Sequence, residues 1–377
     1  MDLDTARPQN NTKSVPNEII SEIVELRNEL SSSNVPVGLK EDTMKSVDRL
    51  QRMAKWGNYS SEFETVDKYV DWITRIPWGK VTEDNLNIQN AKDMMDSTHY
   101  GMDTIKNLIL DYISVMQLKK VKERRDPNSE GKRNSPAPVL LFLGLQGVGK
   151  TTIAQSIAQA MGRKFARVSL GAIGDVRTLR GVPRYEIDAE PGQIVKALVR
   201  TQSMNPVILL DEIEKASVNK GVLNDVMAAL LEILDSEQNS TFLDHYVDYP
   251  VDLSQVFFIC TANNLGGLSA ALLDRLEVIR FTSYSDEDKR IIAKEYILPD
   301  ALADMGLSKE YVQITEEVWP LLIRPVGFDA GIRQLERNIY TLLRSAAREI
   351  VEGKDVPVVI TPDNLKKYVL PDQGPLS

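Results

Sequence analysis

The stretch VLLFLGLQGVGKTTIAQSIAQAM, from Val139 to Met161, decides the fold. It opens with an unbroken apolar run typical of a buried strand and closes with a helical segment. Between them lies GLQGVGKTT, Gly144 to Thr152, which fits the phosphate-binding pattern G-x-x-x-x-G-K-[ST] in the strand–loop–helix context that the pattern requires. The stretch therefore predicts a phosphate-binding loop within an α/β domain.

The residue types of this loop suit a triphosphate bound with Mg²⁺. Glycines let backbone N–H groups turn toward a β-phosphate, and the following helix N-terminus adds partial positive charge. Lys150 is long enough to reach the β- and γ-phosphates, and Thr151 offers a hydroxyl to the metal. The residues expected to contact the nucleotide are Gly144, Leu145, Gln146, Gly147, Val148, Gly149, Lys150, Thr151 and Thr152.

Two adjacent carboxylates end a second apolar run, VILLDEIEK, Val207 to Lys215. A buried charge without a partner is costly, so Asp211 and Glu212 need a reason to stand at the tip of a buried strand. The phosphate loop supplies one, because Asp211 is expected to ligate the magnesium together with Thr151, and Glu212 to orient and deprotonate the attacking water. The other interpretation is a strand end that meets solvent with two ordinary acids.

The rest of the chain alternates strands with helices and then becomes helical. The runs PVLLFLG, FARVSL, PVILLDE and VFFICTA are continuously apolar, which predicts a parallel sheet covered by helices on both faces. Amphipathic helices are expected on either side, the first with Ile20, Ile23, Val24 and Leu30 on one face. The expected division is a flexible tail (1–16), an N-terminal helical bundle (17–82), an α/β nucleotide-binding subdomain (83–283, with a loop insertion at 119–137) and a C-terminal all-α lid (284–377).

Composition excludes several classes of protein. The 377 residues are 42% hydrophobic and 26% charged, as in a soluble globular protein. The net charge of -9 argues against a general nucleic-acid binder. Cys260 lies in the apolar run VFFIC and is expected to be buried and inert, and His99 and His245 stand too far apart to suggest zinc. No run is long enough to span a bilayer and the N-terminus is polar, so a cytoplasmic location without membrane contact is expected.

Two adjacent acids ending one strand, a later strand ending in Asn and a helical lid resemble the AAA+ group of ATPases. From about Asn17 to Leu370 the chain is similar to the ATPase module of the ATP-dependent Lon proteases. The segments that carry this resemblance are DKYVDWITRIPWG, HYGM, ALLEILDSEQNSTFLDHYVDYPVDLSQVFFICTANN, LLDRLEVIRFTSYSDEDK and AGIRQLERN. The resemblance implies a P-loop NTPase fold, ATP with Mg²⁺, and a hexameric ring.

The resemblance also implies roles for residues outside the phosphate loop. Asn263 matches the polar sensor of the hydrolytic water, Arg275 the arginine finger offered to a neighbouring subunit, and Arg333 the lid arginine that senses the γ-phosphate. The other interpretations are a turn residue for Asn263, a salt bridge of Arg275 with Asp274 or Glu277, and a solvated charge for Arg333. In HYGM, the residues His99, Tyr100 and Gly101 match the segment against the adenine, although Tyr100 also suits a core position.

Two features depart from the family. Its substrate-gripping pore loop resembles G-H-R-R-T-Y-[VI]-G-A-M-P-G, whereas this chain has GVPRYEIDAEPG, Gly181 to Gly192. The aromatic position falls on Glu186, with Tyr185 one place earlier and the aliphatic Ile187 kept, so translocation is either weakened or tuned to basic substrates. The family's Ser–Lys peptidase domain has no counterpart among these residues, which leaves open a part of a full protease or a natural relative without that domain.

Three hypotheses follow. The first is an ATP-hydrolysing, ring-forming unfoldase module that acts on unfolded or damaged proteins in protein quality control. The second is a nucleotide-gated binding or regulatory relative that assembles but translocates little. The third is a DNA-associated ATPase, because a basic segment spans Lys119 to Arg133, where a solvated loop is the other interpretation and contact with DNA would be weak and non-specific.

Overall fold

The computed structural model describes residues 17–54, 60–125, 137–172, 175–217, 223–324 and 331–369. The expected tail 1–16 and residues 126–136 of the expected insertion lie outside them. The chain divides into two compact units: unit 1 comprises Met1–Val81, Asp175–Met204 and Glu237–Leu253, and unit 2 comprises Thr82–Gly174, Asn205–Ser236 and Ser254–Ser377. This division is not contiguous along the chain, since two segments from within the expected α/β subdomain group with the N-terminal helices.

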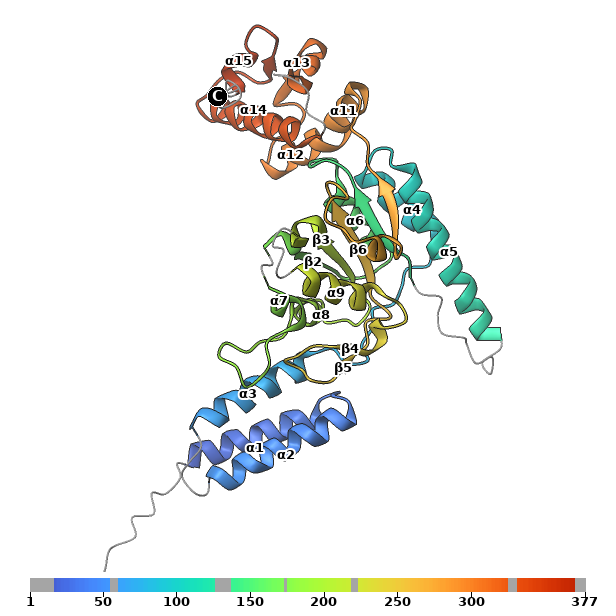
Figure 1. Cartoon of the computed structure of the whole chain (residues 1–377). Coiled ribbons are helices and arrows are strands. Elements are labelled where there is room, and N and C mark those ends of the chain that lie inside the picture. Colours follow the sequence, from blue (N-terminus) through green and yellow to red (C-terminus); the bar gives the residue numbers. More distant parts are fainter. Residues whose placement is uncertain are drawn as a thin grey trace, which may run out of the picture. The chain divides into compact units, whose positions relative to one another are not determined.

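Unit 2 is built on a parallel sheet (Figure 1). Its strands are β1 (Val139–Leu143), β2 (Phe165–Ser169), β3 (Val207–Asp211), β6 (Phe257–Ala262) and β7 (Leu276–Arg280), in the order β2-β3-β6-β1-β7. Every neighbouring pair is parallel. The carboxyl ends of β1, β3 and β6 therefore meet at one edge, where α/β sheets bind their ligands.

Helices pack against this sheet because the strands present large apolar side chains. The helices of this part are α4 (Ile88–Thr98), α5 (Asp103–Arg125), α6 (Lys150–Ala160), α9 (Leu223–Leu234) and α10 (Ala270–Leu273), with short 3-10 turns at Leu170–Ala172 and Ile213–Ser217. One core joins Met95 and Ile109 to Phe142 of β1 and Ile153 of α6, all fully buried. Each such side chain contributes about 1.5–3 kcal/mol relative to an exposed position.

One of the two edge strands differs from the sequence prediction. The run FARVSL was expected to be buried on both faces, but β2 alternates, with Arg167 and Ser169 exposed, because it is an edge strand. Strand β7, at the other edge, is also largely exposed. The central strands β3 and β6 are buried throughout. Cys260 is buried in β6 as expected, and burial raises the pKa of its thiol to about 12.

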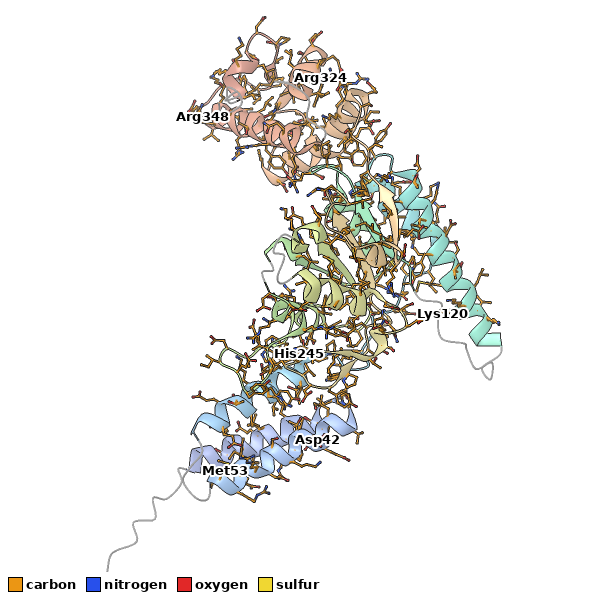
Figure 2. All side chains as sticks on the ribbon, viewed as in Figure 1. Asp42, Met53, Lys120, His245, Arg324 and Arg348 are labelled. Carbon is orange, nitrogen blue, oxygen red and sulfur yellow. The ribbon has the colours of Figure 1, made fainter. Side chains whose placement is uncertain are left out.

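The C-terminal part of unit 2 is mainly helical (Figure 1). It comprises α11 (Asp286–Ile292), a π-helical turn (Ala293–Ile297), α12 (Leu298–Asp304), a 3-10 turn (Glu316–Val318), α13 (Trp319–Ile323), α14 (Arg333–Val351) and α15 (Leu365–Tyr368). Trp319, Leu335 and Leu342 belong to its own buried core. Strands β8 (Val312–Ile314) and β9 (Val358–Ile360) pair in parallel, so the expected all-α lid also contains a two-stranded sheet. Figure 2 marks this part with Arg324 and Arg348.

Unit 1 combines the N-terminal helices with two later segments. Its elements are α1 (Asn17–Ser32), α2 (Val37–Ala54), α3 (Ser60–Arg75), α7 (Arg177–Arg180), α8 (Gln193–Thr201), a 3-10 turn (Asn239–Thr241) and the antiparallel pair β4 (Phe242–Leu243) and β5 (Pro250–Val251). In α1, Ile23 and Leu30 are buried as expected, whereas Ile20 and Val24 are exposed. Leu26 takes their place, which rotates the buried face. Within the described residues, no helix has the length and apolarity needed to cross a bilayer.

Candidate functional site

The phosphate loop lies between β1 and α6 as predicted. Gly147 and Gly149 adopt positive φ values of 81° and 89°, a conformation that side chains other than glycine rarely adopt. A Cβ on Gly144 would lie 2.7 Å from the carbonyl oxygen of Phe281. These glycines are therefore required by the backbone path, independently of any ligand.

Lys150 is buried at the start of α6. Its Nζ donates to the carbonyl oxygens of Gly144 and, at 3.0 Å, of Leu145, and to Asn263 Oδ1 at 3.0 Å. Burial lowers the pKa of Lys150, while the carboxylates of Glu214 and Asp211 oppose that shift. The ammonium group is thus held among oxygen atoms at the strand ends.

Asp211, at the end of β3, has protein partners on both carboxylate oxygens. Its Oδ1 accepts the hydroxyl of Thr261, and its Oδ2 accepts Arg167 Nε at 2.9 Å and Arg167 Nη2. The Asp211 side chain is 8% exposed, and that of Arg167 is 55% exposed. A guanidinium from the edge strand β2 therefore offsets the buried charge.

Glu212 follows with a φ of 59°, in the left-handed region that costs a non-glycine residue about 1–3 kcal/mol. Its N–H donates to Thr261 Oγ1 at 2.9 Å, and its Oε2 accepts Lys215 Nζ at 2.8 Å. A Cβ on Gly171 would lie 2.7 Å from the same Oε2. The strained turn thus places the second carboxylate between Lys215 and the backbone of Gly171.

Asn263 lies just beyond the end of β6 and is held on three sides. Its N–H and Nδ2 donate to Glu214 Oε1 at 3.1 and 2.8 Å, while its Oδ1 accepts Lys150. Because Lys150 is only a donor and a carboxylate is an acceptor, these contacts fix which end of the amide faces the lysine.

The lid contributes Arg333, the first residue of α14. Just before it, the N–H of Ile332 donates to the Gly147 carbonyl at 3.0 Å, and a Cβ on Gly331 would lie 2.8 Å from that same oxygen. The lid backbone therefore packs directly on the phosphate loop. Arg333 stands close enough to Lys150 to lower the pKa of the lysine, as one of the smaller contributions.

A cavity of about 230 Å³ collects most of the predicted phosphate-end residues. It is lined by Gln146, Gly147, Gly149, Lys150, Thr151, Thr152, Arg167, Asp211, Glu212, Thr261, Asn263, Ile332, Arg333 and Glu336. Of the other loop residues, Gly144 and Leu145 accept hydrogen bonds from Lys150 through their carbonyl oxygens, and Val148 lines a second cavity.

That second cavity, of about 360 Å³, lies beside the turn between α4 and α5. It is lined by Tyr100, Gly101, Met102, Asp103, Thr104, Ile105, Val148, Ile279, Arg280, Phe281, Thr282, Ser283, Tyr284 and Asp288. Tyr284 donates from its hydroxyl to the Val148 carbonyl at 3.0 Å and so ties the start of the lid to the phosphate loop. The position suits a base or sugar next to the phosphate cavity.

His99, expected beside the adenine, does not line either cavity. Its Nε2 lies 3.0 Å from Thr152 Oγ1 and its Nδ1 lies 3.0 Å from Thr98 Oγ1. Burial lowers the pKa of His99 to about 4, with a smaller contribution from the Lys106 ammonium. His99 therefore fixes the α4–α5 turn to α6, and Tyr100 and Gly101 are the turn residues that reach the cavity.

Arg275 also lies outside the residues that line the two cavities. Its Nε and Nη2 pair with Asp235 Oδ2 at 3.1 and 3.0 Å, and its Nη1 donates to the Ala271 carbonyl. The salt bridges with Asp274 or Glu277 considered from the sequence are not the pairing observed. Asp235, the residue that follows α9, is the acid that orients this guanidinium.

The three pore-loop candidates lie in unit 1. Tyr185 and Ile187 are 87% and 91% exposed, whereas the Glu186 carboxylate folds back onto Arg177 Nη1 at 2.8 Å. At the base of the loop, the fully buried Asp244 accepts the N–H of Gly192. The loop thus presents an aromatic and an aliphatic side chain, with the intervening acid paired.

Thr151 and Asp211 are compatible with a magnesium site completed by phosphates and water. Within the described part of the chain, no group of three or more His, Cys, Asp or Glu side chains is arranged to hold a metal alone. Mg²⁺ usually takes one or two carboxylates together with substrate phosphates. One carboxylate and one hydroxyl beside a phosphate loop fit that preference.

Sequence reasoning missed Arg167, Glu214, Lys215, Asp235 and Thr261, which position the predicted residues. Arg167 could have been found as the one charge within the apolar run FARVSL. Glu214 could have been found as the third acid in DEIEK. Asp235 and Thr261 had none, because they depend on pairing between distant segments.

Two protein-family models match the chain. The model of the ATPase family associated with various cellular activities (AAA) covers residues 140–284, and the Lon protease AAA+ ATPase lid domain covers residues 303–358. Together with the parallel sheet, they confirm the expected fold class, an AAA+ domain with a helical lid.

Individual proteins show the same similarity. Lon protease 2 of Thermus thermophilus is 43% identical over 350 residues, 93% of this chain and 43% of that protein. The Lon protease of Lawsonia intracellularis is 41% identical over 90% of this chain and 39% of its own length, and the mitochondrial Lon protease homolog of Mus musculus is 40% identical over 85% and 32%. The chain spans less than half the length of each of these relatives.

Proposed function

The chain belongs to the Lon family as an AAA+ ATPase module, and from this premise we propose that it binds Mg·ATP in the two adjoining cavities and hydrolyses it. One observation carries the proposal: Lys150, Asp211, Glu212, Asn263 and Arg333 line a single cavity beside the phosphate loop.

The chain's own residues divide the work of hydrolysis. Lys150 binds the β- and γ-phosphates, and Arg333 brings the lid's positive charge to the γ-phosphate. Glu212 accepts the proton of the attacking water, and Asn263 holds that water, with its amide oriented by Glu214. Thr151 and Asp211 would hold Mg²⁺, which when bound would neutralise phosphate charge and act as a Lewis acid.

We assign Arg275 to the active site of a neighbouring subunit. It lies outside the lining of its own cavities and is held by Asp235 in a fixed orientation. An arginine supplied in trans stabilises transition-state charge, with effects of about 10³-fold or more in other phosphoryl-transfer enzymes. The active assembly is then a ring, and a hexamer is the proposed form.

Substitution of Glu212 tests the catalytic assignment. Glu212→Gln should lower ATP turnover at least about 100-fold while Mg·ATP binding persists, because only the base is removed. Glu277→Gln, the same chemical change on the exposed edge strand, should leave turnover within about twofold. Unchanged turnover in the Glu212 variant would remove this mechanism.

Mixing two inactive variants tests the assignment in trans. Glu212→Gln protomers keep Arg275, and Arg275→Ala protomers keep Glu212, so adjacent pairs in mixed rings form complete sites. Turnover should therefore reappear on mixing and should rise with protein concentration. Additive, near-zero activity in the mixture would contradict a shared site.

We further propose that ATP hydrolysis drives unfolding and translocation of damaged or unfolded proteins for proteolysis in the full-length protein. The named relatives are Lon proteases, and the exposed Tyr185 and Ile187 suit contact with an unfolded polypeptide. The second hypothesis, a nucleotide-gated binding or regulatory relative with weak or no translocation, is not favoured by these similarities. Stimulation of turnover by an unfolded model protein separates the two.

Contact with DNA and the cellular location are minor parts of the proposal. Lys120, on the exposed C-terminal part of α5 (Figure 2), pairs weakly with Glu83 at 3.6 Å and belongs to the basic segment considered for weak DNA contact. Loss of DNA binding at about 0.2 M salt would identify that contact as non-specific. A cytoplasmic location is proposed, to be checked by fractionation of cells that produce the protein.

A further inference from the structure

Arg167 is a cation that the nucleotide chemistry above does not use, although it lines the phosphate cavity. Its guanidinium donates two N–H groups to one oxygen of Asp211, Oδ2. The other oxygen, Oδ1, accepts the buried Thr261 hydroxyl. Both carboxylate oxygens of the proposed metal ligand are therefore already bonded within the protein.

The two partners of Asp211 differ in how easily they leave. Thr261 lies within the central strand β6, and its hydroxyl also accepts the N–H of Glu212, so its position is fixed on two sides. Arg167 extends from the edge strand β2 with its side chain more than half exposed. A rotation of the arginine side chain alone frees Oδ2, without any change in the sheet.

Oδ2 has two acceptor positions, and two guanidinium N–H groups already use them. Metal ligation by Oδ2 uses the electron pairs that now accept two guanidinium N–H groups, and the two positive charges repel each other at that distance. We propose that Arg167 and the divalent cation compete for Asp211 Oδ2, so that Arg167 sets the magnesium concentration at which nucleotide loading is complete. This inference rests on the proposed function and adds a residue that tunes its metal requirement.

A magnesium titration of nucleotide binding measures this competition without turnover. The probe is a fluorescent ADP analogue bound to the full chain, with Mg²⁺ varied from chelated to saturating. Arg167→Met keeps an unbranched side chain of similar length but removes the guanidinium and its charge. The magnesium midpoint should fall at least about tenfold, because the variant lacks both charge-assisted hydrogen bonds to Oδ2. Arg167→Lys, with a single point charge, should give an intermediate midpoint.

Lys215→Met is the matched control. It removes the same unit of charge as Arg167→Met, but from the ion pair of Glu212, which lines the same cavity and holds no metal in the proposal. Its midpoint should stay within about twofold of wild type. An equal fall in both variants would mean that general charge, not competition at Oδ2, sets the midpoint, and would overturn the inference.

Two further outcomes separate this inference from the proposed function. If Arg167→Met lowers the melting temperature but leaves the magnesium midpoint unchanged, Arg167 has only a structural role and the inference is wrong while the function stands. If the wild type binds no nucleotide at any magnesium concentration, the proposed function fails and the inference fails with it.

Discussion

Asp211 in unit 2 and Asp244 in unit 1 are both buried carboxylates, yet they are satisfied in opposite ways. Asp211 is bonded to the side chains of Arg167 and Thr261. Asp244 accepts three backbone N–H groups, from Gly192 at 2.7 Å, Tyr246 at 2.9 Å and Val247 at 3.1 Å. The difference separates an acid whose partner is able to leave from one whose partners are part of the fold.

The surroundings of Asp244 show how it stabilises the base of the loop from Gly181 to Gly192. A Cβ on Gly181 would lie 2.6 Å from its Oδ1, so the loop base closes only around glycine. The loop from Gly181 to Gly192 is thereby anchored at both ends, while Tyr185 and Ile187 stay exposed at its tip. A carboxylate held by backbone groups is released only if the loop itself opens.

Exchange of each acid for its amide gives the largest contrast. Asp211→Asn should lower ATP turnover at least about 100-fold, because the proposed magnesium ligand loses its negative charge. Stability should change little, because Arg167 is exposed and the Thr261 hydroxyl keeps an acceptor. Asp244→Asn should instead lower the free energy of unfolding by about 2–3 kcal/mol, because the amide NH₂ faces a backbone donor. Coupled-enzyme turnover and urea unfolding measure the two effects. If the Asp244 variant is folded but its turnover is equally low, Asp244 does not act through stability alone and the contrast with Asp211 is wrong.

The pH dependence of the two units should have opposite signs. The pKa of His99 is lowered to about 4, below its unfolded value, so its contribution to stability is present above about pH 6.5 and is lost as pH falls. Burial raises the pKa of Asp244 to about 6, opposed by the three N–H groups and Lys196, so its contribution is present below about pH 4 and is lost as pH rises.

Between pH 7 and pH 5 these shifts have measurable sizes. As pH falls from 7 to 5, the free energy of unfolding of unit 2 should decrease by about 2 kcal/mol because of His99. The free energy of unfolding of unit 1 should increase by about 1 kcal/mol because of Asp244. Hydrogen exchange of the Ile153 amide, which donates to the Gly149 carbonyl, and of the Gly192 amide, which donates to Asp244, reports the two units separately once corrected for intrinsic rates. His99→Gln should remove the pH dependence of stability in unit 2 only, and Asp244→Asn should remove it in unit 1 only. A common slope in both units would contradict the assignment.

Removal of the partner of Arg275 gives a smaller effect. Asp235→Asn weakens the ion pair that orients the guanidinium, so turnover in assembled rings should fall about tenfold, while nucleotide affinity stays unchanged. Asp274→Asn is the matched control, since this neighbouring acid is not the observed partner. Equal losses in both variants would show that net charge, rather than orientation, matters at this position.

The sequence was sufficient where one short segment determines both backbone and chemistry. The phosphate loop, the parallel sheet and the buried Cys260 were predicted from local patterns and are present. The counter-ions were not predictable, because the pairing of Asp211 with Arg167 depends on which strand lies beside β3, a consequence of sheet order. The same holds for Asp235 and Arg275, which come from separate helical turns. The exposed Ile20 and Val24 show that periodicity gives a helix but not the exact direction of its buried face.

The smallest expected effects concern the tip of the loop that Asp244 anchors. The Arg177–Glu186 pair is exposed enough that Arg177→Met should change the free energy of unfolding by less than about 1 kcal/mol. Tyr185→Ala and Glu186→Ala should likewise leave basal ATP turnover within about twofold, because neither residue lines the nucleotide cavities. The two should differ only when an unfolded model protein is added: stimulation should be lost without the exposed aromatic and kept without the paired acid. If Glu186→Ala abolishes stimulation and Tyr185→Ala does not, the loop grips substrate through its carboxylate, and the aromatic contact proposed for unit 1 is wrong.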